Sequence, residues 1–381
     1  MKEKIVITFK EIFGTEPLLV QSPGRINLIG EHTDYNGGFV MPAAINKAIT
    51  VGIAKNNLTR ARIYALDLEE EFAFELLSFG PKKGHWAAYI MGVTAQLQQA
   101  GYPVQGYDMV FGGDIPIGAG LSSSAALECA SAFAISSLFG FDIPKRSLIH
   151  YAQKAEHLFA GVHCGIMDQF ASVMGKVGHA ILLDCKELEF SYFPLGLKDH
   201  CLLLVDTQVK HSLAESAYNQ RRQECQQGLE EAKKIKPEAT SLRDLTLDIF
   251  EEIRSEIPDI IYKRCSYVLQ ENSRVLQAAE ALKNNNLSLF GQLMYDSHKG
   301  LSKTYEVSCE ELDFLVEATK NLPYVLGSRM VGGGFGGCTL NLVEKDKFEA
   351  LKQILEDSYQ QQFGQKPLFY EVSLSDGTGI L

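Results

Sequence analysis

The chain lacks any long apolar stretch and any closely paired cysteines. No apolar run in its 381 residues approaches the ~18 residues of a membrane-spanning helix, so no membrane partner is expected. Its eight cysteines are scattered without a Cys-x-x-Cys spacing, which argues against a zinc site or a dithiol redox centre. Scattered thiols of this kind are typical of a reduced, cytoplasmic protein.

Positive charge is also scarce. Lys and Arg number 36 against 47 Asp and Glu, a formal net charge of −11. Proteins that bind nucleic acid or anionic membranes carry a basic surface, so neither partner is expected, and no obligatory protein partner is evident. Residues 1–10 place charges where a signal peptide needs an apolar stretch, which favours a cytoplasmic location. An anionic substrate remains compatible, because local cations and a metal ion can reverse the field.

What the chain does have is an ordinary globular composition, with 46% hydrophobic and 22% charged residues. Strand and helix patterns interleave, which predicts an α+β fold with a division near residue 185, into residues 1–185 and 186–381. Residues 1–80 indicate mainly strands and turns. Later strands are expected at 107–111, 179–184, 201–206, 339–343 and 368–372, and helices at 86–99, 122–138, after Pro144, and over most of 212–321.

The densest group of polar side chains lies in residues 22–38, Ser-Pro-Gly-Arg-Ile-Asn-Leu-Ile-Gly-Glu-His-Thr-Asp-Tyr-Asn-Gly-Gly. A buried strand would need apolar residues where the chain has Glu31, His32 and Asp34. Such side chains suit a ligand with many hydroxyl groups, because each hydroxyl both donates and accepts hydrogen bonds. We call this segment the signature segment.

A second motif is the serine loop, residues 116–124, Pro-Ile-Gly-Ala-Gly-Leu-Ser-Ser-Ser. Its glycines let backbone approach a ligand, and its serines open a predicted helix whose free N–H groups favour an anion. The segment lacks the Gly-x-x-x-x-Gly-Lys-Ser/Thr spacing of a Walker loop. The alternative is that the serines only cap the helix.

A third motif is the glycine loop, residues 332–337, in which Gly332, Gly334 and Gly337 formally satisfy Gly-x-Gly-x-x-Gly. A dinucleotide fingerprint must follow a strand and open a helix. Here we expect a helix before the loop and a strand after it, so that reading is rejected. The loop is expected to bring backbone near a ligand or near the serine loop, or simply to form a tight connection.

Two further segments, and Glu156 shortly before the first of them, carry candidate site residues whose role spacing alone does not decide. In residues 161–170, Asp168 stands between apolar neighbours and is either a solvated loop residue or a site carboxylate. Glu156, taken alone, reads as an exposed helix residue. The segment around Tyr218, with the charged residues that follow it, otherwise reads as the solvated face of a helix.

These five segments resemble, in order, the motifs of galactokinases, within the wider family of GHMP small-molecule kinases. The resemblance implies a ribosomal-protein-S5-like N-terminal domain, a ferredoxin-like C-terminal domain and an active site in the cleft between them. It also implies transfer of the γ-phosphoryl group of ATP to the anomeric hydroxyl of galactose. One departure is Ala88, which stands where the family usually has Asn.

The resemblance also implies roles for individual residues. Arg25 and Asp168 would be catalytic, and Asp168 would either take the proton of the sugar hydroxyl or only orient it. Ser123 and Glu156 would bind Mg²⁺. The sugar would contact Glu31, His32, Asp34, Gly165, Asp168 and Tyr218. The ATP phosphates would contact Pro116, Gly118, Ala119, Gly120, Leu121, Ser122, Ser123 and Ser124.

Two alternatives stay open at this point. One is a sister kinase acting on N-acetylgalactosamine or arabinose, which would share most of these motifs. The other is a regulator that binds galactose and ATP without turnover. Such a regulator would be altered around the serine loop, whereas here the three serines, Arg25 and Asp168 are all present.

Overall fold

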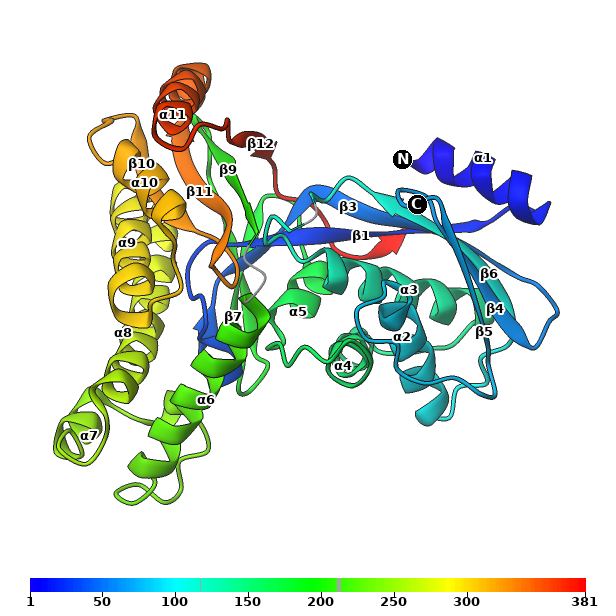
Figure 1. Ribbon diagram of the computed structural model, residues 1–381, viewed down its shortest axis with the longest axis horizontal. Helices are drawn as coiled ribbons and strands as arrows, with labels where there is room; N and C mark the ends of the chain where they lie inside the picture. The colour runs from blue at the N-terminus through cyan, green and yellow to red at the C-terminus, as the bar shows by residue number, and fades with distance from the viewer. Residues whose placement is uncertain (117, 211–213) are drawn as a thin grey trace.

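The computed structural model describes residues 1–116, 118–210 and 214–381. The protein has two lobes that lie side by side (Figure 1). The first lobe is built on a six-stranded sheet in the order β13-β1-β3-β6-β4-β5, in which all pairs except β4 with β6 are antiparallel. Its strands are β1 (Leu18–Asn27), β3 (Pro42–Lys55), β4 (Arg60–Ala65), β5 (Glu70–Glu75), β6 (Tyr107–Gly113) and β13 (Gly379–Ile380).

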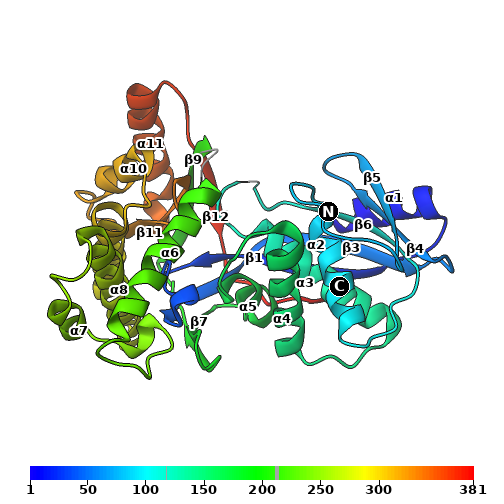
Figure 2. The ribbon, with the colours of Figure 1, turned by 60° about the horizontal axis from the view of Figure 1, so that its bottom comes forward.

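Helices cover both faces of this sheet. On one face lies α1, and on the other lie α2 and α3, with α4, the π-helical turn η2 and α5 packed beside them (Figure 2). The apolar side chains of α2 and α3 join the sheet in the largest hydrophobic core of the molecule. These elements are α1 (Lys2–Phe13), α2 (Ala87–Gln99), α3 (Ser123–Phe139), α4 (Lys145–Ala155), η2 (Glu156–Ala160) and α5 (Met167–Met174).

Residues 1–80 are mainly strands and turns, as expected, but helix α1 is an exception. Ile5 and Phe9, four residues apart, are the fully buried positions of this helix and pack with Leu19 and Val110 of the sheet. The helix ends at Gly14, whose φ of 74° is the left-handed value common after helices. A run of β-branched residues favoured a strand, and packing against the sheet overrides that preference.

The second lobe is a four-stranded antiparallel sheet in the order β10-β11-β9-β12. Numbered along the chain this is the 4-1-3-2 order of a ferredoxin-like βαββαβ unit, which confirms that expectation and the α+β class. Helices α10 and α11 pack on the sheet through Leu315, Leu351 and Leu355. The elements are β9 (His200–Lys210), β10 (Val325–Met330), β11 (Gly336–Glu344), β12 (Leu368–Val372), α10 (Glu310–Thr319) and α11 (Phe348–Phe363).

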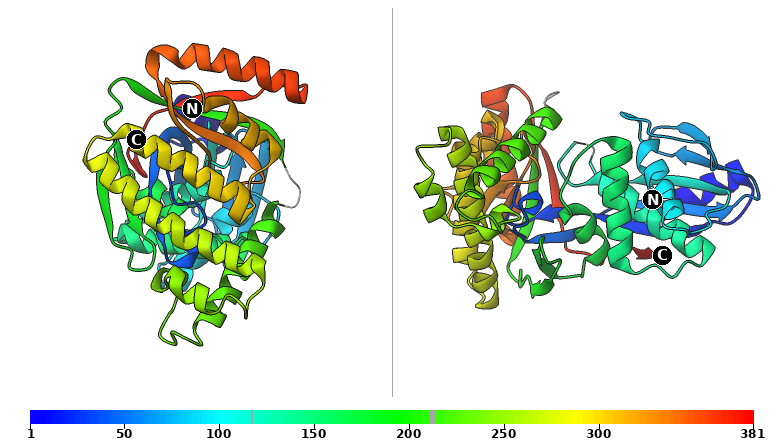
Figure 3. Two further views of the ribbon diagram at one scale, coloured as in Figure 1. Left: turned by 90° about the vertical axis from the view of Figure 1, so that its left-hand side faces the viewer. Right: turned by 90° about the horizontal axis from the view of Figure 1, so that it is seen from below.

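A helical segment is inserted between β9 and β10. Two of its helices, α8 and α9, lie side by side (Figure 3). Its helices are interrupted at Pro258 and at residues 284–286, while the expected start at residue 212 lies outside the described residues. The segment contains α6 (Ala214–Ala232), η3 (Leu242–Asp244), α7 (Leu247–Glu252), α8 (Asp259–Lys283), α9 (Leu287–Gly300) and the π-helical turn η4 (Leu301–Tyr305).

The element before the glycine loop is a strand, not the helix that the sequence indicated. β10 pairs with β11, so the glycine loop is the connection of an antiparallel hairpin. The rejection of the dinucleotide fingerprint still holds, because no helix opens after the loop. β10 contains Gly327 and Arg329, which break the apolar run that would mark a buried strand.

The chain returns to the first lobe at its C-terminal end. β13 pairs with β1, and an isolated bridge joins Ile45 to Leu374 (Figure 1). A small antiparallel sheet of β2 (Phe39–Val40), β7 (His179–Asp184) and β8 (Phe190–Pro194) contacts both β3 and α8. The division at residue 185 stays a prediction. In the described parts of the chain, no helix combines the length and apolar character needed to cross a bilayer.

Candidate active site

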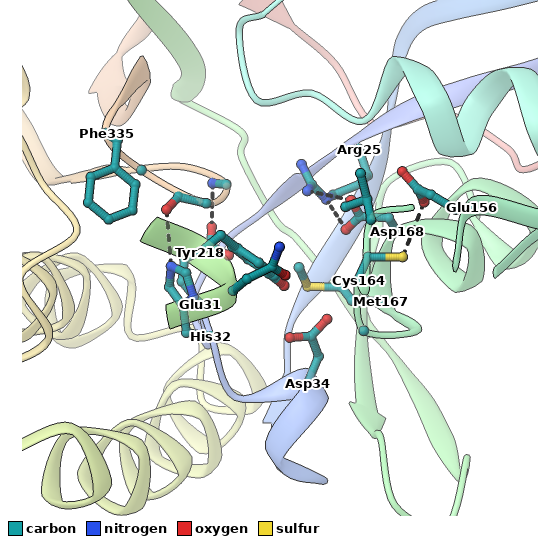
Figure 4. A pocket seen from close by; sticks show the side chains of 16 residues that line it. Arg25, Glu31, His32, Asp34, Glu156, Cys164, Met167, Asp168, Tyr218 and Phe335 are labelled. Carbon is teal, nitrogen blue, oxygen red and sulfur yellow. Dashed lines mark hydrogen bonds and ion pairs between the residues drawn. The ribbon is translucent and has the colours of Figure 1, made fainter. Parts of the chain in front are cut away.

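One pocket is lined by side chains and backbone from both lobes (Figure 4). It brings together the two predicted catalytic residues, Glu156 and all of the predicted sugar-binding residues, whereas the serine loop lies beside it. Its lining consists of Arg25, Glu31, His32, Asp34, Glu156, Val162, Cys164, Gly165, Met167, Asp168, Tyr218, Asn219, Gly332, Gly333, Gly334 and Phe335.

A β-bulge in β1 places Arg25 at this pocket. The pairing of β1 with β3 shifts register between Pro23 and Arg25, and bulges of this kind re-aim side chains next to active sites. The Arg25 N–H donates to the carbonyl of Leu121 at 3.1 Å. A Cβ on Gly24 would lie 2.6 Å from the same oxygen, so only glycine fits where β1 meets the serine loop.

Arg25 and Asp168 form a bidentate ion pair. Nε and Nη2 of Arg25 donate to the two Asp168 oxygens at 2.8 and 2.9 Å, and Nη1 donates to the carbonyl of Gly120 at 2.5 Å. Burial would lower the pKa of Arg25, but the charges of Asp168 and Glu31 outweigh it and the pKa is raised. The pocket therefore contains a permanent guanidinium cation next to a carboxylate.

The serine loop opens α3, as predicted. Ser122 is the N-cap residue, yet its side chain makes no capping hydrogen bond. Its hydroxyl instead donates to Asp168 Oδ2 at 2.5 Å, and its φ of 59° is a strained value for a residue with a side chain. The alternative that Ser122 only caps the helix is therefore wrong. The first N–H groups of α3 are left free to bind an anion.

Glu156 is held by neutral donors. Its carboxylate accepts hydrogen bonds from Ser124 Oγ at 2.9 Å, Cys164 Sγ at 3.1 Å and Gln169 Nε2 at 2.7 Å. Burial raises the pKa of Glu156, and no ion pair within the described residues offsets it. The residue begins the π-helical turn η2, a feature often found at functional sites. Ser124 contacts Glu156, while the role of Ser123 stays a prediction.

Glu31 ties the signature segment to the glycine loop. Its side chain is 2% exposed and accepts from the N–H of Gly332 at 2.8 Å and from Asn27 Nδ2 at 3.1 Å. Arg329 Nη1 lies 3.5 Å from Oε1 of Glu31, the same oxygen that accepts from Gly332. Burial raises the pKa of Glu31, although Arg329 and Arg25 oppose this. Glu31 thus fixes the two lobes together as well as lining the pocket.

His32 is neutral and bridges the same two segments. Its Nε2 lies 3.2 Å from the carbonyl oxygen of Gly333 and therefore carries the hydrogen, which leaves Nδ1 to accept from the Tyr35 hydroxyl at 2.8 Å. Burial lowers the pKa of His32 to about 3. Its ring packs against Tyr218 of α6, with the ring centroids 5.3 Å apart. Both ring nitrogens are thus engaged with the protein in this structure.

Asp34 enters the pocket because residue 165 is a glycine. A Cβ on Gly165 would lie 1.8 Å from Asp34 Oδ2, so any other residue would displace the carboxylate. Burial and the nearby charge of Asp168 raise the pKa of Asp34 to about 7. Asp34 therefore exchanges a proton near neutral pH when no ligand is bound.

The serine loop and the glycine loop lie against each other. A Cβ on Gly332, which has a φ of 81°, would lie 3.0 Å from the carbonyl oxygen of Gly120. A Cβ on Gly337 would lie 3.3 Å from that of Ala119. The prediction that the glycine loop brings backbone near the serine loop is confirmed. Which loop holds a triphosphate stays a prediction.

Sequence reasoning missed four residues of this site: the pocket thiol Cys164, the bridging amide Gln169, the buried acid Glu128 and Arg329. Cys164 and Gln169 belong to the Cys-Gly-Ile-Met-Asp-Gln segment around Asp168, so their position was the available signal. Glu128 follows the serine loop on α3 and Arg329 precedes the glycine loop on β10, but only the folded structure shows their contacts with Gln169 and Glu31.

Family models match three parts of the chain. They describe a galactokinase galactose-binding signature at residues 7–55, the N-terminal domain of GHMP kinases at 88–176 and their C-terminal domain at 278–361. A crystal structure of a mevalonate kinase shares the fold, with a TM-score of 0.68 at 19% identity over 94% of this chain and 99% of that chain. Fold and site together define a GHMP kinase.

Similarity to galactokinases extends over nearly the whole chain. The galactokinase of Thermotoga maritima is 44% identical over 358 residues, which cover 94% of this chain and 98% of that protein. That of Roseiflexus sp. is 40% identical over 97% of this chain and 95% of that protein. The structure of Lactococcus lactis galactokinase complexed with galactose superimposes with a TM-score of 0.94 at 35% identity, covering 99% and 98% of the two chains. The chain belongs to the galactokinase family.

Proposed function

We propose that this protein transfers the γ-phosphoryl group of ATP to the anomeric hydroxyl of galactose, forming α-galactose 1-phosphate and ADP. The observation that carries the proposal is the bidentate pair of Arg25 and Asp168 in a pocket between the signature segment and the serine loop. Support comes from family membership and from the Lactococcus lactis relative, which was solved with galactose.

Phosphoryl transfer needs alignment and charge neutralisation more than covalent help. In this proposal the signature segment, Gly165 and Tyr218 bind the sugar hydroxyls, and the serine loop binds the phosphates. Arg25 spreads the negative charge of the transferring group. Asp168 lies next to the anomeric hydroxyl and either accepts its proton or orients it.

A magnesium ion fits the oxygen donors around Glu156. Mg²⁺ prefers carboxylate and hydroxyl oxygens and retains several waters. Glu156 is a buried carboxylate whose hydrogen-bond partners are neutral, and one of them is the Ser124 hydroxyl. Glu156 with Ser123, as the family resemblance implies, or with Ser124 would hold the ion. When bound, Mg²⁺ would neutralise charge on the nucleotide phosphates.

The two alternatives gain no support from the site. A sensor without turnover has no need of the intact pair of Arg25 and Asp168 beside a complete serine loop. We also place the protein in the cytoplasm, because all eight cysteines are free thiols in the structure, which suits a reducing compartment.

The test is a panel of sugars assayed for ADP release with ATP and Mg²⁺, with the product identified by phosphorus NMR. Galactose is expected to give galactose 1-phosphate, and glucose a far lower rate. Glucose differs from galactose only in the configuration of its 4-hydroxyl group. A site that pairs each sugar hydroxyl with a hydrogen-bonding partner rejects such an analogue strongly. Faster turnover of N-acetylgalactosamine or arabinose, or no ADP above a control without sugar, would contradict the proposal.

A further inference from the structure

Gln169 is a buried amide at the centre of the site to which no role has yet been given. It follows Asp168 in the first turn of α5 and is 0% exposed. An amide nitrogen carries two hydrogens. Nε2 of Gln169 directs one hydrogen bond to Glu156 Oε2 at 2.7 Å and one to Glu128 Oε2 at 3.1 Å.

Glu128 is the second hydrogen-bond acceptor of this amide. It lies on α3, four residues after Ser124, and is 0% exposed. Gln169 is its one recorded hydrogen-bond partner among the described residues, and its Oε1 has none. Burying a carboxyl group with so little compensation costs free energy, so its place beside the site calls for a reason other than stability.

The two hydrogen bonds join three elements that carry the site. Glu128 belongs to α3, which the serine loop opens; Glu156 begins η2; and Gln169 shares the first turn of α5 with Asp168. The Ser124 hydroxyl and the Cys164 thiol also bind Glu156, but each is a single rotatable donor. The amide of Gln169 cannot turn away from Glu156 without also losing Glu128.

We propose that Gln169, anchored on Glu128, is a positioning residue that fixes the Glu156 carboxylate for the metal ion of the nucleotide. The inference rests on the proposed metal-binding role of Glu156. Partners that orient a metal ligand commonly contribute one to two decades of metal affinity. Because Gln169 and Asp168 are adjacent, one turn of α5 sets the positions of both the metal ligand and the carboxylate beside the sugar.

The test is the affinity for Mn²⁺, used in place of Mg²⁺ and measured by electron paramagnetic resonance with ADP present. Gln169→Met keeps the size of the side chain and removes both donors. We expect it to weaken Mn²⁺ binding about 10- to 100-fold, while galactose binding without nucleotide stays close to that of the unchanged protein. Gln153→Met is the matched control, because Gln153 donates to the backbone of Cys164 at 3.4 Å and does not contact Glu156. It should retain Mn²⁺ affinity.

A pair of variants at Glu128 carries the test if Gln169→Met does not fold, as judged by circular dichroism and thermal melting. Glu128→Leu removes the acceptor and should weaken Mn²⁺ binding, and Glu128→Gln restores an acceptor oxygen and should recover most of the loss. Equal Mn²⁺ affinity in Gln169→Met and the unchanged protein, or in the two Glu128 variants, overturns the inference.

Glu156→Gln separates this inference from the proposed function. If Glu156→Gln binds Mn²⁺ as tightly as the unchanged protein, the metal-binding role of Glu156 fails, and the inference fails with it. If Glu156→Gln loses the ion while Gln169→Met retains it, only the positioning role of Gln169 is wrong.

Discussion

Two of the carboxylates that line the pocket, Asp168 and Glu156, are compensated in different ways. Asp168 is paired through both oxygens with the guanidinium of Arg25. Glu156, on η2, is bound only by a hydroxyl, a thiol and an amide, all of them neutral. Asp168 thus has a permanent cation as its partner, whereas the hydrogen-bond donors that surround Glu156 are neutral (Figure 4).

This contrast explains how one pocket can serve two chemical tasks. A carboxylate bound through both oxygens by a guanidinium is held in place whether or not a nucleotide is present. Binding a cation offsets the free-energy cost of burying a carboxylate that has no charged partner. Such a site can therefore take up a metal ion that enters and leaves with the nucleotide. We therefore assign Asp168 to the sugar hydroxyl and Glu156 to the metal ion.

The largest expected effect is at Asp168. Asp168→Asn keeps the shape of the side chain but removes the charge, and we expect kcat for galactose phosphorylation to fall by about 10²- to 10⁴-fold. Raising the Mg²⁺ concentration should not restore it, because the ion binds elsewhere. Steady-state ADP release measures both kcat and its dependence on the Mg²⁺ concentration. A rate within about tenfold of the unchanged protein, a loss under roughly 1.4 kcal/mol of barrier, would show that Asp168 is not catalytic.

A smaller and different effect is expected at Glu156. Glu156→Gln keeps the hydrogen-bonding shape and removes one metal ligand, so we expect activity at low Mg²⁺ to fall by about 10²-fold, since metal ligation provides several kcal/mol. Excess Mg²⁺ should recover part of this loss, in contrast to Asp168→Asn. A Mg²⁺ titration of the rate compares the two variants, and identical titration curves would remove the distinction between the two carboxylates.

The smallest expected effect concerns Asp34 and is a change in stability. Its pKa of about 7 in the folded protein lies above the ordinary 3.8, so the folded state holds a proton that the unfolded chain has released. The free energy of unfolding should therefore fall as pH rises from about 4 to 7. Asp34→Asn should remove that loss of stability, so that it stabilises the ligand-free protein at pH 8 and has little effect at pH 4.

Urea unfolding of both proteins at pH 4 and pH 8 measures the Asp34 effect. Galactose binding should be weaker in Asp34→Asn at both pH values, because the variant loses an acceptor in the pocket. A stability difference that does not change with pH would mean that Asp34 ionises normally and that Asp168 is compensated fully by Arg25.

Much of the site could be predicted because its residues cluster in short motifs. Arg25 and Asp168 stand among glycines and apolar residues, Asp34 belongs to the polar run of the signature segment, and the structure brings all three to one pocket. The start of α3 at the serines could be predicted because serine is common at helix starts, although the Ser122 side chain makes no capping hydrogen bond. The sequence shows these site residues because each belongs to a short motif whose own backbone turns place its side chain.

The rest depends on contacts between distant segments. Helix α1 is helical because Ile5 and Phe9 pack on the sheet, although its β-branched residues favour a strand. β10 is a strand because it pairs with β11. The turn of the Ser122 side chain toward Asp168, and the contact of Ser124 rather than Ser123 with Glu156, depend on where α5 and η2 lie. The spacing of residues along the chain does not determine the distances between side chains on separate elements.

The most direct test of the division between the two carboxylates is an anomalous difference map from crystals grown with MnADP and galactose. The account predicts a manganese peak within coordination distance of the Glu156 carboxylate and a serine hydroxyl of the 122–124 run, with Asp168 still paired to Arg25 and close to the anomeric hydroxyl. A peak bound by Asp168 and Asp34, with Glu156 still held by Ser124 and Gln169, would contradict it.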